Sequence, residues 1–378
     1  MDERLRFIVE CQESMESFSA ICRTFGVSRK TGYKWVERYE TLGASGLCEV
    51  KQVPDVHPGW LKDAELDVII QARKEHPHWG PKKLQVLLVK SHPDMPRVGV
   101  STIAGVLKRF GLIQPRRRRP RAPVFDGTLD PGSAVNDVWA ADFKGHFALG
   151  NGDRCYPLTI TDSASRFILK CEGLSEPKEA PVRVQFERAF VEFGLPIKLR
   201  SDNGPPFASL APGGLSKLSV WWVKLGILPE RIEPGHPEQN GRHERMHRTL
   251  KAEATQPAER DLKRQQRVFD TFRRHFNQER PHEALGQKCP ASGYCASTRT
   301  LPSTLRSPEY ASGMETRKLD SHGRIRWKMD RLTITPLLAG EPVATREIDD
   351  DRFELFFGPI LLGDLETRKG ASRFVCKR

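Results

Sequence analysis

The stretch DVWAADFKGHFAL, residues 137–149, decides the fold. It is mostly apolar, and a second apolar stretch, CYPLTITDSASRFILKC, follows at residues 155–171 after a short polar gap. Runs of this kind predict two antiparallel strands. Helix-like and strand-like stretches then alternate: APVRVQFERAFVEFG (180–194), IKLRSD (197–202), LSKLSVWWVKLG (215–226), RIEPG (231–235) and a helix that begins near Asn240. Antiparallel strands followed by such alternation predict a mixed α/β sheet.

Three carboxylates stand where a sheet of this kind builds a site. Asp142 lies among apolar residues of the first strand, where an ionised carboxylate is costly unless it is paired or bound to a metal. Asp202 ends a later strand, and an Asn-Gly turn follows it. Glu244 falls in the first turns of the helix that opens after HPEQNG (236–241). Two aspartates on neighbouring strands and a glutamate on a helix can converge on a hard divalent cation.

The same helix carries HERMH (243–247), which fits the HExxH zinc signature of metalloproteases. In that alternative, His243 and His247 would ligate zinc and Glu244 would act as the general base. A third ligand at a recognisable spacing is absent from the sequence, and the two aspartates would have no role. The sequence therefore favours the carboxylate site.

The composition indicates a polyanionic partner. The 378 residues include 61 Lys and Arg against 48 Asp and Glu, which gives a net charge of +13 and a pI near 9.5. Nucleic acid is the leading candidate, ahead of an anionic membrane surface. The start of the chain does not resemble a signal peptide, and no stretch approaches the roughly 18 apolar residues of a membrane span. Eight scattered cysteines without a CxxC pair predict a reduced, cytoplasmic protein with no disulfide framework.

Residues 1–50 predict a helix-turn-helix unit. Gly26 separates two amphipathic stretches, and Ser28 is placed to cap the second of them. The second helix is basic, as a DNA-recognition helix is, although a solvated helix of a small bundle is the alternative. We expect DNA contacts from four of its side chains: Arg29, Lys30, Tyr33 and Lys34.

Residues 55–113 predict a second helix-turn-helix or winged-helix-like unit. Its helices, in 64–91 and 98–113, are separated by a proline-containing turn, and Ser101 is the expected N-cap of the last one. Two successive units can contact a longer DNA site than one. The alternative is a packing domain that does not touch DNA.

A basic linker is expected at residues 114–129. Its arginines and prolines permit neither a helix nor a buried strand, and its charge suits contact with phosphates. The arginines expected to contact DNA are Arg116, Arg117, Arg118 and Arg119.

The last part of the chain predicts a small all-β barrel at residues 316–378, after a polar linker at 296–315. The evidence is a series of short strand-like runs: GRIRWK (323–328), RLTITPLL (331–338), RFELFFG (352–358) and ILLGDLE (360–366).

The central motifs, taken in order, resemble those of a known family. WAADFKG (139–145), SDNGPPF (201–207) and HPEQNGRHERMHRTLK (236–251) are similar to the signature of the ribonuclease H-like catalytic domain shared by retroviral integrases and insertion-sequence transposases. The tandem helix-turn-helix units, NQERPHEALGQKCPASGY (277–294) and the β tail resemble the bacterial insertion-sequence branch, so the likeness covers nearly the whole chain. It places the catalytic domain at residues 130–295.

This resemblance implies a DDE transposase, in which Asp142, Asp202 and Glu244 are the catalytic residues and the metal ligands. It implies two ions of Mg²⁺ or Mn²⁺ per site, with one activating the attacking oxygen and the other stabilising the leaving oxygen. The enzyme would bind terminal inverted repeats, cleave a phosphodiester at each element end and join the 3′-hydroxyl to target DNA. The expected partner is double-stranded DNA, bound by a homodimer or homotetramer that is nucleoid-associated in a bacterial cytoplasm.

Two glutamates compete for the third carboxylate. Glu238 follows Asp202 after 35 residues, the best-known spacing of the family, whereas Glu244 follows after 41. The family's glutamate, however, comes three residues after the Asn-Gly pair and begins a helix, which selects Glu244. An insertion around SLAPGGLSK (209–217) explains the longer gap. Arg248 and Lys251, at i+4 and i+7 from Glu244, would then share its helix face and meet DNA phosphate.

A function of a different class stays open at this point. The chain could be a non-catalytic DNA-binding regulator whose central domain is only structural. The presence of all three carboxylates argues against this alternative, because a descendant without catalysis is free to lose any of them.

Overall fold

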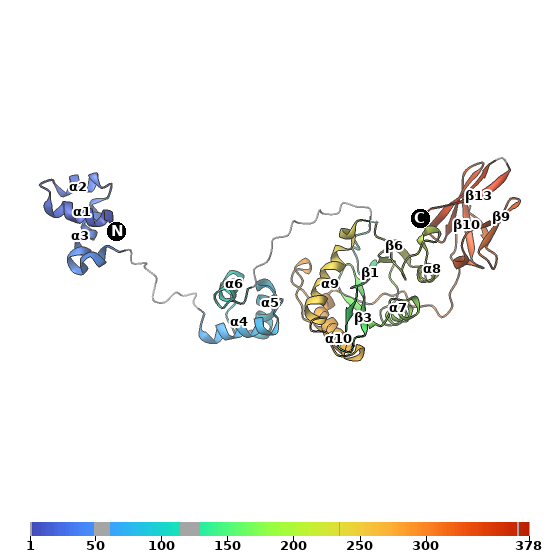
Figure 1. Ribbon diagram of the computed structural model, residues 1–378, viewed down its shortest axis with the longest axis horizontal. Helices are drawn as coiled ribbons and strands as arrows, with labels where there is room; N and C mark the ends of the chain where they lie inside the picture. The colour runs from blue at the N-terminus through green and yellow to red at the C-terminus, as the bar shows by residue number, and fades with distance from the viewer. Residues whose placement is uncertain (1, 49–60, 114–128, 234, 369, 378) are drawn as a thin grey trace. The chain divides into compact units, whose positions relative to one another are not determined.

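The computed structural model describes residues 2–48, 61–113, 129–233, 235–368 and 370–377 (Figure 1). The chain divides into two compact units, residues 1–63 and residues 64–378. Arg116, Arg117, Arg118 and Arg119, predicted to contact DNA, lie outside the described residues.

The first unit contains three helices: α1 (Asp2–Glu13), α2 (Phe18–Thr24) and α3 (Arg29–Leu42). They enclose a small core around Phe7, Ile8 and Ile21. The hydroxyl of Ser28 accepts a hydrogen bond from the Thr31 backbone N–H at 3.1 Å, which confirms the predicted N-cap of α3. The helix-turn-helix arrangement expected from Gly26 is therefore present.

The second unit begins with three more helices: α4 (Asp63–Glu75), α5 (Pro81–Ser91) and α6 (Val100–Arg109). The prediction that Ser101 caps α6 is wrong, because the N-cap is Gly99 and no side chain caps this end. The Gly99 carbonyl accepts from the Ile103 N–H, so the first turn already closes before Ser101.

The central region is a mixed sheet covered by helices on both faces. Its strands are β1 (Val138–Phe143), β2 (Phe147–Ala148), β3 (Arg154–Asp162), β4 (Ile168–Leu174), β5 (Lys198–Ser201) and β6 (Leu228–Arg231). The order is β2-β3-β1-β5-β6, with β4 also paired to β3. The pairs β1–β3 and β3–β4 are antiparallel, and β1–β5 and β5–β6 are parallel. The predicted mixed α/β sheet is confirmed.

One face of the sheet packs against α7 (Glu179–Phe193) and α8 (Lys217–Lys224), the other against α9 (Gly241–Ala254) and α10 (Leu262–Gln278) (Figure 1). Successive residues of a strand point to opposite faces. Trp139 and Ala141 of β1 accordingly lie in the core with α7 and α8, and Asp142 falls on the α9 face.

The C-terminal part is all-β. A five-stranded sheet has the order β13-β12-β11-β10-β7, and β8 pairs only with β9. The bounds are β7 (Glu315–Lys318), β8 (Arg324–Trp327), β9 (Asp330–Thr333), β10 (Pro342–Asp349), β11 (Arg352–Phe357), β12 (Ile360–Arg368) and β13 (Ala371–Cys376).

The predicted closed barrel is wrong. Within the described residues, the edge strands β7 and β13 do not pair with each other. A barrel buries its core by closing the sheet on itself, but here the apolar face is covered from outside. Leu215, Val220 and Val223, on and just before α8, share one core with Val343 and Leu355 of the tail. Residues on and just before α8 thus cover the apolar face of the open sheet.

None of the helices in the described parts of the chain has the length and apolar character needed to cross a membrane.

Candidate active site

Asp142 lies near the end of β1, directly opposite Thr159 of β3. Its side chain is 21% exposed and faces α9. Asp142 therefore lies on an apolar strand, but its side chain still reaches solvent beside α9. A carboxylate there can meet both a metal ion and a DNA strand.

Asp202 follows the last residue of β5. Because β1 and β5 are adjacent and parallel, their carboxyl ends meet at the same edge of the sheet. The Gly204 N–H donates to Asp202 Oδ1 at 3.2 Å, and the Asn203 amide donates to the Ile232 carbonyl at 2.6 Å. The Asn-Gly turn thus fixes the carboxylate at this edge.

Glu244 lies in the first turn of α9 and is exposed. The positive end of the helix dipole favours a carboxylate at this point. The helix is anchored to the sheet by His243 and His247, whose Nε2 atoms both lie 2.7 Å from Thr159 Oγ1. Since Thr159 is the register partner of Asp142, this anchor brings the start of α9 next to Asp142.

The charges of the other two carboxylates act on Asp142. The pKa of Asp142 is raised to about 7, first by burial and then by the charge of Asp202, with Glu244 acting in the same direction. A backbone hydrogen bond and the charge of Lys144 oppose these effects. Burial also raises the pKa of Asp202. Across the described residues, neither Asp202 nor Glu244 forms an ion pair.

Carboxylate oxygens are the ligands that hard divalent cations such as Mg²⁺ and Mn²⁺ prefer. A bound ion would add positive charge to that of Lys144 beside Asp142. The donor set therefore matches the predicted cofactor.

Glu238 is placed differently from Glu244. It lies in a short 3-10 turn before α9, where its Oε1 is 2.8 Å from His236 Nδ1. The charge of Glu244, and not that of Glu238, is among those acting on Asp142. The geometry therefore supports the choice of Glu244.

The structure supplies the third zinc ligand that the sequence lacked, but it argues against the zinc alternative in another way. Asp142 supplies a third ligand, because one ligand atom each from Asp142, His243 and His247 lies within 4.8 Å of the others. However, both imidazoles are buried against β3 and hydrogen-bonded to Thr159. Burial lowers the pKa of His243 to about 3 and that of His247 to about 2, so both rings are neutral anchors of the helix. A protease zinc needs an open position for water, which two enclosed histidines do not favour.

The structure adds a neighbour that the sequence analysis missed. His247 Nδ1 lies 3.7 Å from Asp142 Oδ2, so this imidazole borders the Asp142 carboxylate. The HExxH pattern pointed to His247 only as a zinc ligand. Its position three residues after Glu244 was the available signal, since i and i+3 are neighbours on a helix.

The predicted DNA contacts fall on exposed surfaces. All the α3 side chains predicted to contact DNA are exposed: Arg29, Lys30, Tyr33 and Lys34. Tyr33 also stacks on Phe18, with ring centroids 4.2 Å apart, which holds its ring beside α2. On α9, Arg248 and Lys251 are exposed and follow Glu244 by one and two turns.

The role of Thr159 can be tested by Thr159→Val, which keeps the side-chain shape. Its hydroxyl contacts both buried imidazoles and the Asp142 carbonyl, so the valine leaves two buried nitrogens without partners. We expect the free energy of unfolding to fall by about 2–4 kcal/mol. Urea denaturation measures it, with Thr249→Val as the control, because the Thr249 hydroxyl bonds only an exposed helix carbonyl. A loss no larger than that of the control would contradict the anchoring role.

Comparison with known families agrees with this geometry. The integrase core domain family matches residues 132–237 and 225–290, and homeodomain-like families match residues 1–48 and 31–107. Residues 132–290 form an integrase core domain. In this integrase core, Asp142, Asp202 and Glu244 all lie within the matched residues.

The integrase core has relatives in bacteria and viruses. The chain is 30% identical over 234 residues to the insertion element IS476 uncharacterized 39.2 kDa protein of Xanthomonas euvesicatoria, covering 61% of this chain and 64% of that protein. It is 28% identical over 200 residues to a Gag-Pol polyprotein of baboon endogenous virus (strain M7), covering 52% of this chain and 11% of the polyprotein. The chain therefore spans less than two thirds of either relative.

Among solved structures, the HTLV-2 integrase catalytic core domain in complex with magnesium (trimeric form) shares 15% identity, with a TM-score of 0.35, and covers 43% of this chain and 99% of that chain. The chain is homologous to insertion-element transposases and retroviral integrases.

Proposed function

We propose that this protein is a DNA transposase of insertion-sequence type. It binds the terminal inverted repeats of its element, cleaves a phosphodiester at each end and joins the 3′-hydroxyl ends to target DNA. The observation that most supports the proposal is that Asp142 and Asp202 lie at the same edge of a sheet in residues that match the integrase core domain family, with the charge of Glu244 acting on Asp142.

The chemistry divides between the cofactor and the chain. Two ions of Mg²⁺ or Mn²⁺, held by Asp142, Asp202 and Glu244, would activate the attacking oxygen and stabilise the leaving oxygen. The protein's part is to orient these ligands: Thr159 and the two histidines fix α9, and the Asn-Gly turn fixes Asp202.

Two in-line displacements complete the reaction. In the first, a P–O bond forms to water as the P–O bond at the element end breaks, which frees the 3′-hydroxyl. In the second, that hydroxyl attacks a target phosphodiester and displaces its 3′-oxygen, with no covalent enzyme intermediate. Arg248 and Lys251, exposed on the same helix as Glu244, would bind the phosphate backbone.

Sequence recognition is assigned to the N-terminal helices. We propose that α3 enters the DNA major groove with its first two turns, as recognition helices do. A homodimer or homotetramer would hold two element ends together, in the bacterial cytoplasm and at the nucleoid.

The recognition role predicts the result of Arg29→Ala with Lys30→Ala. Both side chains are exposed and neither is part of the α3 core, so the fold should stand. Loss of two phosphate contacts should weaken binding to element ends and reduce the slope of log affinity against log salt by about 2. Fluorescence anisotropy at several salt concentrations measures both. An unchanged slope would place DNA elsewhere on the unit.

The proposed function is tested by incubating the purified chain with labelled element-end DNA, a plasmid target and Mg²⁺ or Mn²⁺. Metal-dependent nicking followed by joining would establish the transposase. Nicking without joining would indicate a nuclease. Binding without any reaction, by folded protein in the presence of metal, would favour the DNA-binding regulator.

A further inference from the structure

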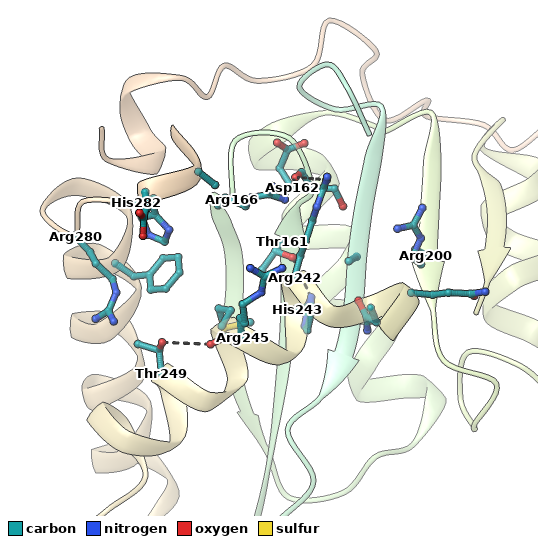
Figure 2. A pocket seen from close by; sticks show the side chains of 18 of the residues that line it. Thr161, Asp162, Arg166, Arg200, Arg242, His243, Arg245, Thr249, Arg280 and His282 are labelled. Carbon is teal, nitrogen blue, oxygen red and sulfur yellow. Dashed lines mark hydrogen bonds between the residues drawn. The ribbon is translucent and has the colours of Figure 1, made fainter. Parts of the chain in front are cut away.

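A pocket lies on a different side of α9 from Glu244. It has a volume of about 270 Å³ and is bordered by α9, the β3–β4 turn and the segment after α10 (Figure 2). Arg242, Arg245 and Thr249 line it at i, i+3 and i+7 of α9. Glu244 does not line it, so the pocket is separate from the proposed catalytic carboxylates.

The pocket has positive charge that is not neutralised. Two of its arginines are paired, since Arg200 bonds Glu230 and Arg280 bonds Glu253. Three others, Arg166, Arg242 and Arg245, form no ion pair within the ranges that the structure describes. These three form what we term the arginine cluster. The cluster is suited to bind an anion, because guanidinium groups bond phosphate oxygens in a fixed fork.

Two members of the arginine cluster, Arg166 and Arg242, are held in place by the β3–β4 turn. Asp162 builds this turn by accepting hydrogen bonds from the Ser165 N–H and hydroxyl at 2.7 and 2.6 Å. Arg166, at its end, has a positive φ of 65°, an unusual backbone conformation for a side-chain-bearing residue. Arg166 and Arg242 both donate to the Ser163 carbonyl, so their guanidinium groups lie together.

The closeness of these charges costs free energy. The pKa of Arg166 is lowered to about 10 by burial and then by the charges of Arg242 and Arg245. Like charges this close destabilise one another, and a bound anion would relieve the repulsion.

The remaining wall is apolar, with two nitrogens that lack partners. Met246 and Phe276 supply apolar surface. The His282 ring packs edge-on against the Phe276 ring, with ring centroids 4.7 Å apart. His282 Nε2 and Gln239 Nε2 are buried without a hydrogen-bond partner. Gln239 is 7% exposed, and its Oε1 accepts from the Glu233 N–H at 2.7 Å, which assigns the free nitrogen as the donor. Buried polar groups are normally hydrogen-bonded, so two unsatisfied nitrogens in one wall point to a ligand.

We infer that this pocket binds a nucleotide unit, with its phosphate on the arginine cluster and its base against Met246 and Phe276. The volume is close to the lower end of about 300 Å³ for small-ligand pockets and exceeds what a phosphate alone needs. The nucleotide can be free, or it can be a residue unstacked from a DNA strand, which costs only a few kcal/mol. The assignment goes beyond the proposed function by adding a site, and its DNA form rests on that function.

The first arm of the test is calorimetric titration of the full chain with dAMP, inorganic phosphate or deoxyadenosine. We expect dAMP to bind more tightly than either fragment. Arg242→Gln and Arg245→Gln should each raise the Kd for dAMP about tenfold or more, because each removes charge-assisted hydrogen bonds. Arg274→Gln, an exposed arginine of α10 outside the pocket, is the control with the same charge change and should leave the Kd unaltered.

The second arm separates the sources of the nucleotide. Element-end duplexes carrying 2-aminopurine near the cleaved bond should become more fluorescent on binding if a base leaves the stack, and Arg242→Gln should lose this rise while still binding DNA. A dAMP site without a fluorescence rise assigns the pocket to free nucleotides. No dAMP binding by folded wild type at millimolar concentration, or equal binding by the variants and wild type, overturns the inference. Failure of the proposed function would instead appear as absent cleavage in wild type, which the dAMP titration does not depend on.

Discussion

Asp142→Asn, Asp202→Asn and Glu244→Gln should each lower the rate of DNA cleavage and joining by at least about 1000-fold. Each variant removes one carboxylate of the proposed site, in which the charges of Asp202 and Glu244 act on Asp142. Metal-assisted stabilisation of a phosphodiester transition state is worth several kcal/mol, and every 1.4 kcal/mol or so is tenfold in rate. Gel analysis of labelled element ends measures the loss.

Binding of the same DNA should change by less than about threefold in all three variants, because the basic surfaces of α3 and α9 are untouched. Glu238→Gln is the matched control: it removes a nearby carboxylate that is hydrogen-bonded to His236 and should keep the wild-type rate. Retained cleavage in Glu244→Gln together with loss in Glu238→Gln would overturn the assignment of the third carboxylate.

The second large predicted effect is on the free energy of unfolding of the metal-free protein as the pH changes. Asp142 has a pKa of about 7 in the folded chain against 3.8 ordinarily, so the folded state holds a proton that the unfolded state releases between pH 4 and 7. The free energy of unfolding therefore falls as pH rises through this window, by about 4 kcal/mol in total. Asp142→Asn removes the penalty. The metal-free variant should melt at a higher temperature than wild type at pH 8, and at the same temperature near pH 4.

Mg²⁺ should reverse the order of the two melting temperatures at pH 8, so that wild type melts above Asp142→Asn. Bound metal replaces the proton on Asp142, so it should raise the melting temperature of wild type more at pH 8 than at pH 6, and it should not stabilise Asp142→Asn. Calorimetry in chelator and in millimolar Mg²⁺ makes the comparison, with Asp153→Asn as an exposed control. Equal Mg²⁺ stabilisation of wild type and Asp142→Asn would show that Asp142 is not a ligand.

The central fold could be predicted from sequence because its first strands appear as continuous apolar runs. The stretch 137–149 appears as β1 and the short β2, and the stretch 155–171 appears as β3 and the start of β4, so each predicted strand is divided in two. The helix after HPEQNG appears as α9. The strand expected near RIEPG lies slightly earlier, at Leu228–Arg231, since its partner β5 and not its own composition fixes its position.

The C-terminal part was less predictable. Strand-like runs located β8, β9, β11 and β12, whereas no run predicted β7, β10 or β13. Their pairing depends on contacts between residues far apart in the chain, such as Val343 with Arg317. Cover of the sheet by Val220 and Val223 of α8 is likewise a tertiary contact, which local pattern does not contain.

At the site, sequence motifs located the carboxylates but not their surroundings. Asp142, Asp202 and Glu244 each follow from a local pattern. Thr159 of β3 contacts two histidines of α9, 84 and 88 residues away, and a contact between such distant residues is not contained in local sequence. The arginine cluster combines a turn with a helix in the same way, so neither stretch alone indicates it.

The most direct test of the central claim uses a crystal of the full chain soaked in Mn²⁺. Anomalous diffraction is measured at the manganese absorption edge. The carboxylate site predicts anomalous density bounded by oxygens of Asp142, Asp202 and Glu244. Density held by Asp142, His243 and His247, with none at Asp202 or Glu244, would contradict it.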